Sequence, residues 1–215
     1  LTNGRWDWKL VRMDDPNFGT GNPVTNTNAV VAPLNPEFTE DEFKFYLEDI
    51  SPSLVITTEN HKVISEAKSK NIPIGIVDYN GESLKIDFRG SGPDNKNYTS
   101  ANENNSCLFL HTSGTTSRPK GVPLKHKNLL KSLTNIVETY ELNKEDIAMV
   151  VMPLFHVHGL IGVALSTLAS GGQIVIPAKF SASAFWDIQN KYNATWYSAV
   201  PTIHQILLLR ADQDK

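Results

Sequence analysis

The sequence has one cysteine, little excess charge and no long apolar run, and each shortage excludes a class of protein. Cys107 cannot form a disulfide within the chain, so we expect no disulfide framework and a reducing compartment. Its position in an apolar strand favours an inert core thiol over a nucleophile. A net charge of −3 gives no electrostatic reason to expect nucleic acid or an anionic membrane as a partner. The apolar stretch 157–169 is shorter than the roughly 20 residues of a membrane helix, so no membrane span is predicted.

The composition indicates a folded α/β protein. Apolar residues make up 40% of the 215 residues and charged residues 20%, which is enough for a substantial core. From residue 29 onward, strand-like and helix-like segments alternate, which predicts layers of parallel sheet with crossover helices. The expected strands are 30–32, 54–57, 74–77, 107–110, 147–152, 174–176 and 195–198. The expected helices are one capped by Thr39, then 59–70, one with an apolar stripe from Leu129 to Tyr140, 160–168, 184–192 and 202–209.

Two segments interrupt this alternation. Residues 1–28 are irregular and poorly specified, and residues 89–106 are rich in Gly, Ser, Asn, Asp and Pro, as in a solvated connector. The chain begins with Leu1 rather than methionine and stops on a polar stretch. We therefore expect it to be a piece of a longer protein.

Residues 111–121 read His-Thr-Ser-Gly-Thr-Thr-Ser-Arg-Pro-Lys-Gly, after an apolar strand and before a long amphipathic helix. The hydroxyl-bearing residues of this stretch are Thr112, Ser113, Thr115, Thr116 and Ser117. Gly114 and Gly121 allow the backbone to curl, and Lys120 adds a compact positive charge. This combination predicts a loop that binds phosphate, although Ser/Thr/Gly clusters also form plain surface turns. It is not a Walker loop, because Pro119 stands where the second glycine would be.

The stretch from Thr112 to Gly121 resembles the phosphate loop of the adenylate-forming enzymes, which include acyl-CoA synthetases, luciferases and peptide-synthetase adenylation domains. Their pattern is approximately T-S-G-[ST]-T-G-x-P-K-G, and Ser117 replaces one glycine of it. The resemblance covers about residues 29–211. It implies that residues 29–215 are a partial AMP-binding N-terminal domain whose C-terminal domain is absent. It also implies ATP, Mg²⁺ and CoA as cofactors, with the ATP phosphates held by residues 112–117 and Lys120 and with Thr116 as a contact to the metal.

A second motif, Phe155-His156-Val157-His158, follows an expected buried strand, where open α/β sheets place ligands. For an isolated histidine the preferred interpretation is a satisfied polar group at a strand end. A metal site is disfavoured, because no nearby Cys, Asp or Glu completes a ligand set. The resemblance implies that His156 orients the carboxylate being activated, as a catalytic residue beside Lys120. It also implies that His156 and Phe155 gate the tunnel for the thiol.

The acid is suggested by two further stretches. Residues 151–162 are similar to those of oxalyl-CoA synthetases, and residues 196–202 resemble the strand and turn that line the acyl pocket, with Val200 among them. His158 would donate to the far end of a short polar acid. The resemblance thus implies an ATP-dependent acid–CoA ligase that acts on a short dicarboxylate such as oxalate, with that acid and CoA as its small-molecule partners.

Three alternatives stay open: a non-catalytic nucleotide-binding module in which Ser117 marks lost activity, a ligase for medium-chain or aromatic acids, and a protein-interaction domain with an inherited fold. Several family elements have no counterpart in the sequence. These are a Tyr-Gly-x-Thr-Glu segment, a ribose-binding Thr-Gly-Asp and the C-terminal domain with its lysine. Residues 1–215 are therefore expected to be inactive alone. The expected location is cytoplasmic or peroxisomal, and no oligomeric state is predicted.

Overall fold

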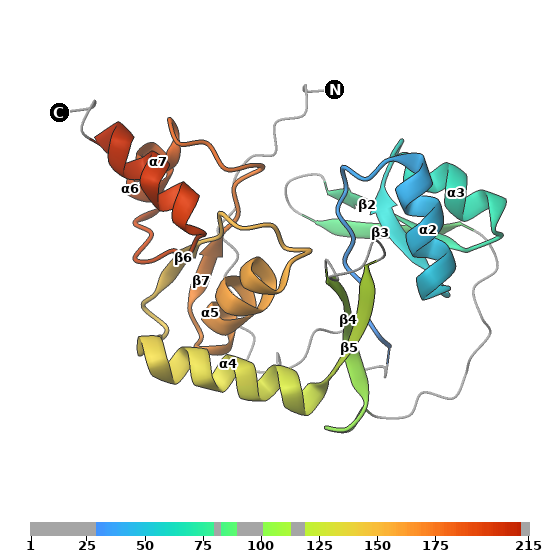
Figure 1. Ribbon diagram of the computed structural model, residues 1–215, viewed down its shortest axis with the longest axis horizontal. Coiled ribbons are helices and arrows are strands. Elements are labelled where there is room, and N and C mark those ends of the chain that lie inside the picture. The colour runs from blue at the N-terminus through green and yellow to red at the C-terminus, as the bar shows by residue number, and fades with distance from the viewer. Residues whose placement is uncertain (1–28, 80–82, 90–100, 113–118, 212–215) are drawn as a thin grey trace. The chain divides into compact units, whose positions relative to one another are not determined.

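The computed structural model describes residues 29–79, 83–89, 101–112 and 119–211 (Figure 1). The chain divides into two compact units, one formed by residues 34–99 and the other by residues 1–33 with 100–215. Both units mix helices and strands, which confirms the α/β class. Within the described residues, no helix is both long and apolar enough to cross a membrane.

The unit of residues 34–99 places two helices on one face of a three-stranded sheet. Its elements in chain order are α2 (Glu40–Ile50), β1 (Val55–Thr58), α3 (Val63–Ser69), β2 (Ile74–Tyr79) and β3 (Leu84–Arg89). The strand order is β1-β2-β3, with β1 parallel to β2 and β3 antiparallel to β2. The core is apolar and draws on both helices and on one face of the sheet: Phe43, Leu47, Val55, Val63, Ala67, Ile74 and Ile76.

Two elements of this unit differ from the sequence-based expectation. The helix expected at 59–70 is shorter, since α3 spans only Val63–Ser69. Strand β3 was not expected, and all of its side chains are exposed. Its sequence, Leu-Lys-Ile-Asp-Phe-Arg, nevertheless alternates apolar and polar residues, so the pattern typical of a strand was present and was missed.

The other unit contains the segments that the sequence singled out. Its elements are β4 (Ser106–Thr112), β5 (Lys120–Lys125), α4 (His126–Tyr140), β6 (Ile147–Met149), the π-helix η1 (His158–Leu165), α5 (Ser166–Ala169), β7 (Gln173–Val175), α6 (Phe185–Tyr192) and α7 (Pro201–Ala211). Strands β4 and β5 form an antiparallel pair, whereas β6 and β7 are parallel and are joined through η1 and α5. The β6–η1–α5–β7 path is the crossover connection that the alternation predicts.

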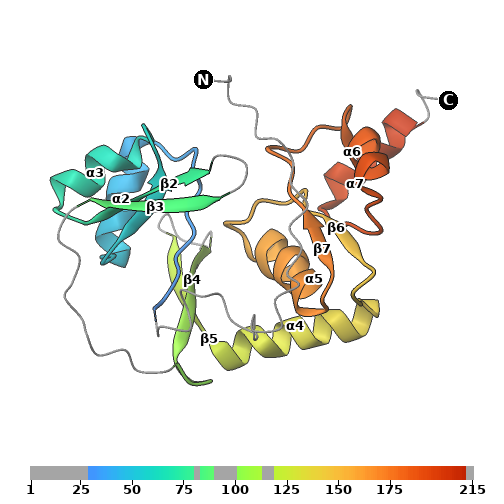
Figure 2. The same ribbon diagram turned by 180° about the vertical axis from the view of Figure 1, so that it is seen from behind.

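Strand β6 is covered on both faces. Ala148 and Val150 pack with a cluster that includes Val163 of η1, whereas Met149 packs with a cluster that includes Phe185 of α6. Figure 2 shows α5 on one side of the β6–β7 pair and α6 and α7 on the other. Burial on both faces explains why this stretch reads as a continuous apolar run rather than an alternation.

Three other expected elements are smaller or different. The strand expected at 195–198 makes a single parallel bridge, from Trp196 to Ala148, and the strand expected at 30–32 makes one from Val31 to Leu108. The helix expected at 160–168 is the π-helix η1 followed by α5. These two bridges connect Trp196 to β6 and Val31 to β4.

The expectation that the phosphate loop leads directly into the amphipathic helix is wrong. Strand β5 lies between them, and α4 begins only at His126. Residues 113–119 therefore connect two antiparallel strands. The alternation in β5, with half-buried Val122 and Leu124 between exposed neighbours, is obscured in the sequence by Gly121 and Pro123. In the described part of the chain the loop is thus followed by a strand and not by the N-terminus of a helix, which would favour an anion.

Candidate functional site

The base of the candidate phosphate loop is closed by a strand pair. Thr112, the last residue of β4, lies opposite Lys120, the first residue of β5. The Thr112 hydroxyl donates to the backbone carbonyl of Lys120 at 3.4 Å, and both side chains are exposed. Among the described residues, Lys120 makes no ion pair. A hydroxyl and an unpaired ammonium thus stand together where the loop begins and ends.

The other predicted members of the loop lie outside the described residues: Ser113, Gly114, Thr115, Thr116 and Ser117. Their role in phosphate binding, and that of Thr116 toward a metal, stays a prediction. Among the residues that the structure does describe, no group of three or more His, Cys, Asp or Glu side chains is placed to hold a metal ion.

Gly121 has a packing role that the sequence did not reveal. A Cβ atom at this position would lie 2.2 Å from Cζ of Phe109, whose ring comes from the facing strand β4. The ring also contacts His111, with centroids 5.2 Å apart. Gly121 is therefore explained by an aromatic ring lying against the backbone of β5, next to Lys120.

The chain turns sharply between the apolar stretch that contains β6 and the start of η1, and this turn carries the second motif. A Cβ at Gly159 would lie 2.4 Å from the carbonyl oxygens of both Met152 and Pro153, so only glycine fits this close approach. Within the turn, the His156 backbone N–H donates to the Pro153 carbonyl at 3.2 Å. The rings of Phe155 and His156 lie 4.6 Å apart at 51°, and the His156 side chain is exposed. The turn thus places Phe155 and His156 after the carboxyl end of β6, which pairs in parallel with β7.

His158 meets the other segment that the sequence assigned to the acyl pocket. Its Nε2 lies 2.8 Å from Oγ of Ser198, and both residues are half-buried. Ser198 follows Trp196, which makes the parallel bridge to β6, and precedes Val200, whose carbonyl accepts the N–H of Ile203 as α7 begins. The structure therefore brings together residues 151–162 and 196–202, the two stretches that suggested the acid. Val200, in the second stretch, is exposed.

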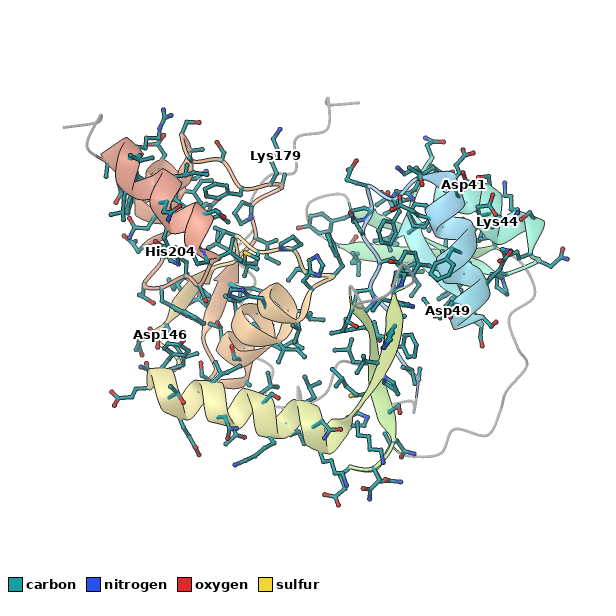
Figure 3. All side chains as sticks on the ribbon, in the orientation of Figure 1. Asp41, Lys44, Asp49, Asp146, Lys179 and His204 are labelled. Atoms are coloured by element: carbon teal, nitrogen blue, oxygen red, sulfur yellow. The ribbon has the colours of Figure 1, made fainter. Side chains whose placement is uncertain are left out.

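Sequence reasoning missed Ser198 and His204 as individual residues. His204, by the first turn of α7 in Figure 3, has Nε2 3.2 Å from the Ala199 carbonyl and Nδ1 3.1 Å from the Tyr197 hydroxyl. Because a carbonyl only accepts, Nε2–H donates to Ala199, and Nδ1 of the neutral ring accepts from Tyr197. The sequence did contain a signal for His204. It is a histidine in a largely apolar helical stretch, where a polar side chain is expected to have hydrogen-bond partners.

Cys107 has the structural role that the sequence favoured. It is buried in β4, and its thiol lies 3.5 Å from the Leu124 carbonyl of β5. Burial raises the pKa of the Cys107 thiol, because the thiolate would lose its hydration. The thiol therefore stays protonated near neutral pH and is not a nucleophile of this site.

Comparison with known proteins extends these observations. The family model described as "AMP-binding enzyme" matches residues 24–215. The oxalate–CoA ligase of Arabidopsis thaliana is 44% identical over 195 residues, which are 87% of this chain and 38% of that protein. The oxalate–CoA ligase of Saccharomyces cerevisiae is 37% identical over 204 residues, which are 82% of this chain and 38% of that protein.

Solved structures agree in fold. ATP-bound MatB from Rhodopseudomonas palustris is 25% identical with a TM-score of 0.69, over 86% of this chain and 37% of that protein. A malonyl-CoA ligase with methylmalonyl-CoA and AMP bound is 28% identical with a TM-score of 0.67, over 84% and 36%. The chain thus spans less than two fifths of the length of these relatives. The match over almost its whole length shows that it belongs to the AMP-binding, adenylate-forming enzyme family.

Proposed function

We propose that this chain is part of the N-terminal domain of an AMP-forming acid–CoA ligase whose acid is a short dicarboxylate such as oxalate. In this proposal residues 29–215 form a partial AMP-binding domain, and the remaining domain lies elsewhere in a longer protein. Two relatives that cover more than four fifths of the chain are named oxalate–CoA ligases, which supports the acid. ATP in one structural relative, and AMP with an acyl-CoA in another, support the co-substrates.

The observation that carries the proposal is the pairing of Thr112 with Lys120 at the base of the loop. In the first half-reaction, a carboxylate oxygen of the acid attacks the α-phosphorus of ATP, and the bond to the bridging oxygen of pyrophosphate breaks. Negative charge accumulates on the leaving pyrophosphate. In this proposal the Lys120 ammonium and the Thr112 hydroxyl, which are exposed at the loop's two ends, bind the β- and γ-phosphates and compensate that charge.

The second half-reaction uses the turn after β6. The thiolate of CoA attacks the acyl carbon and AMP leaves, so that a thioester replaces the mixed anhydride. In this proposal the exposed His156 ring, backed by Phe155, orients the carboxylate by hydrogen bonding in the first half-reaction, and the two side chains gate the path of the thiol in the second. His158 and Val200 would line the rest of the acid pocket, with His158 toward the far carboxylate.

In this proposal Mg²⁺ is included because it is usually coordinated by the phosphates of ATP. The described residues do not form a site of their own for it, and Thr116 lies outside them.

Replacement of Lys120 tests the proposed role of the loop. In the full-length protein that contains this chain, we expect Lys120→Ala to lower oxalate-dependent pyrophosphate release by about 100-fold, the scale of losing one charge-stabilising donor. Lys127→Ala is the matched control, because Lys127 is exposed in the first turn of α4 and belongs to no part of the proposed site. Equal rates for the wild type and Lys120→Ala would contradict the proposal.

Substrate profiling of the same protein tests the acid. We expect AMP formation with oxalate or malonate and much less with a fatty acid or a cinnamate. AMP formation with a fatty acid or a cinnamate alone would instead identify the medium-chain or aromatic acid ligase. ATP binding without turnover of any acid would identify the non-catalytic nucleotide-binding module.

A further inference from the structure

The contact between His158 and Ser198 joins residues 40 positions apart in the sequence. His158 is the first residue of η1, and its Nε2 lies 2.8 Å from the Ser198 hydroxyl. For the other ring nitrogen, Nδ1, the described part of the chain offers no hydrogen-bond partner. One ring nitrogen thus has a partner in the protein, and the described residues supply none for the other.

The ring plane of His158 is restricted from a second side. Gly162 lies one turn along η1, and a Cβ at that position would be 3.5 Å from Cδ2 of His158. Cδ2 therefore faces the backbone of η1, while the neighbouring atom Nε2 contacts Ser198. Because Nδ1 is bonded to neither of these atoms, it lies on the remaining edge of the imidazole.

Ser198 stands on a firmly connected segment. Before it, the Trp196 carbonyl accepts a backbone N–H of β6 at 3.0 Å. After it, the Ala199 carbonyl accepts from Nε2 of His204, whose Nδ1 accepts from the Tyr197 hydroxyl. These bonds attach the segment to β6 on one side and to α7 on the other. The backbone that carries the Ser198 hydroxyl is therefore held in place by contacts within the protein.

On the basis of the proposed ligase function, we propose that Ser198 is a positioning residue that makes His158 a donor to the far carboxylate of a short dicarboxylate. When the Ser198 O–H donates to Nε2, the proton of the neutral imidazole resides on Nδ1. Nδ1–H then donates to a carboxylate oxygen. Ser198 does not touch the reacting atoms and acts only through the orientation and tautomer of His158.

Ser198→Ala in the full-length protein tests this role. We expect the KM for oxalate to rise about tenfold, the scale of a weakened hydrogen bond to a charged group. The KM for ATP and kcat should stay within about twofold, since Ser198 acts on acid binding and not on the phosphate loop. Ser198→Thr keeps the hydroxyl and should restore the KM for oxalate.

A spectroscopic measurement separates positioning from general damage. In protein labelled with ¹⁵N-histidine and assigned with His158→Gln, Ser198→Ala should move the His158 proton from Nδ1 toward Nε2, because Nε2 loses its donor. Ser183→Ala is the matched control, since Ser183 is exposed and, within the described residues, its hydroxyl hydrogen-bonds with that of Ser181 at 3.0 Å. It should change neither KM nor the spectrum.

The outcomes distinguish this inference from the function on which it rests. If the wild type ligates oxalate and Ser198→Ala leaves the KM for oxalate or the His158 signal unchanged, the inference is overturned and the proposed function stands. If Ser198→Ala lowers kcat and raises the KM for ATP as much as that for oxalate, Ser198 is merely structural and the inference is again overturned. If the wild type ligates no dicarboxylate, both are overturned.

Discussion

Two glycines beside the candidate site are explained by steric contact rather than by backbone angle. Gly121 lies under the ring of Phe109, and Gly159 lies against the carbonyl oxygens of Met152 and Pro153. Neither has a positive φ. Because protein interiors are close-packed, a methyl group at either position must displace its neighbours. The two glycines therefore shape the β4–β5 pair next to Lys120 and the turn that carries His156.

Gly121→Ala should destabilise the β4–β5 pair. The new methyl would lie 2.2 Å from the Phe109 ring, and we expect a cost of about 1–3 kcal/mol for overpacking. The measurement is the thermal midpoint of the full-length protein, together with amide exchange across β4 and β5. The double variant Gly121→Ala/Phe109→Ala removes the clash and should recover part of the exchange protection. Unchanged protection in Gly121→Ala alone would contradict this reading.

At the scale of elements, helix ends and helix type are set by identifiable hydrogen bonds. Helix α2 begins with a complete capping box: the Thr39 hydroxyl accepts from the Glu42 N–H at 3.2 Å, and the Glu42 carboxylate accepts from the Thr39 N–H at 2.7 Å. In η1, the wider π-helix passes into α5 where the buried hydroxyls of Ser166 and Thr167 donate to the Val163 carbonyl at 3.1 and 2.6 Å. These bonds satisfy a carbonyl at the change of helix type.

Thr39→Ala should fray the first turn of α2, at a cost of about 1 kcal/mol for a lost N-cap. The bonds from Thr39 lower the pKa of the Glu42 carboxyl, first through the backbone N–H and then through the hydroxyl. A carboxyl with a lowered pKa in the folded state stabilises it at neutral pH. This stabilisation is lost as the pH falls through the ordinary glutamate range to the lowered pKa.

Amide exchange in residues 40–43 provides the measurement for Thr39→Ala. In the wild type, protection of this turn should weaken as the pH is lowered through that range, after correction for intrinsic exchange rates. Thr39→Ala should start from weaker protection and show less of the pH dependence. Thr39→Ser keeps the hydroxyl and should behave as the wild type. Equal protection in the alanine variant at neutral pH would show that the cap does not stabilise the helix.

At the scale of the whole molecule, the chain holds two compact units, each with its own core. One carries both ends of the candidate phosphate loop and the whole histidine motif. The chain spans less than two fifths of the length of its curated relatives. Adenylation needs a site for the base and ribose of ATP as well as for its phosphates. The family segments for these groups have no counterpart among the 215 residues.

Residues 1–215 alone should therefore form no acyl-CoA. The expected result is no oxalate-dependent release of AMP above background, because the acyl adenylate is not formed when ATP is held only by its phosphates. The assay is AMP release with ATP, oxalate and CoA, and the full-length protein serves as the positive control. Acyl-CoA formation by the 215-residue chain at the rate of the full-length protein would show that this region is sufficient.

The features that the sequence predicted correctly are those that depend on neighbouring residues. The capping box at Thr39, the α/β alternation and the inert Cys107 all follow from local pattern and composition. The phosphate motif also identified the family, although the roles of its residues remain predictions. Strand β5 was missed because Gly121 and Pro123 obscure its alternation of apolar and polar residues. Its backbone hydrogen bonds are made with β4, a pairing that the sequence pattern does not reveal.

Tertiary structure alone decided which side chains meet. The pairing of Thr112 with Lys120, the Phe109 ring over Gly121 and the contact of His158 with Ser198 each depend on how the backbone folds back on itself. Hydrogen bonds and close contacts act over a few ångströms in space, and distance along the chain does not reveal them. The amino-acid sequence by itself therefore determined the family and the kinds of groups available. The fold determined which of those groups face one another and which ring nitrogen of His158 contacts Ser198.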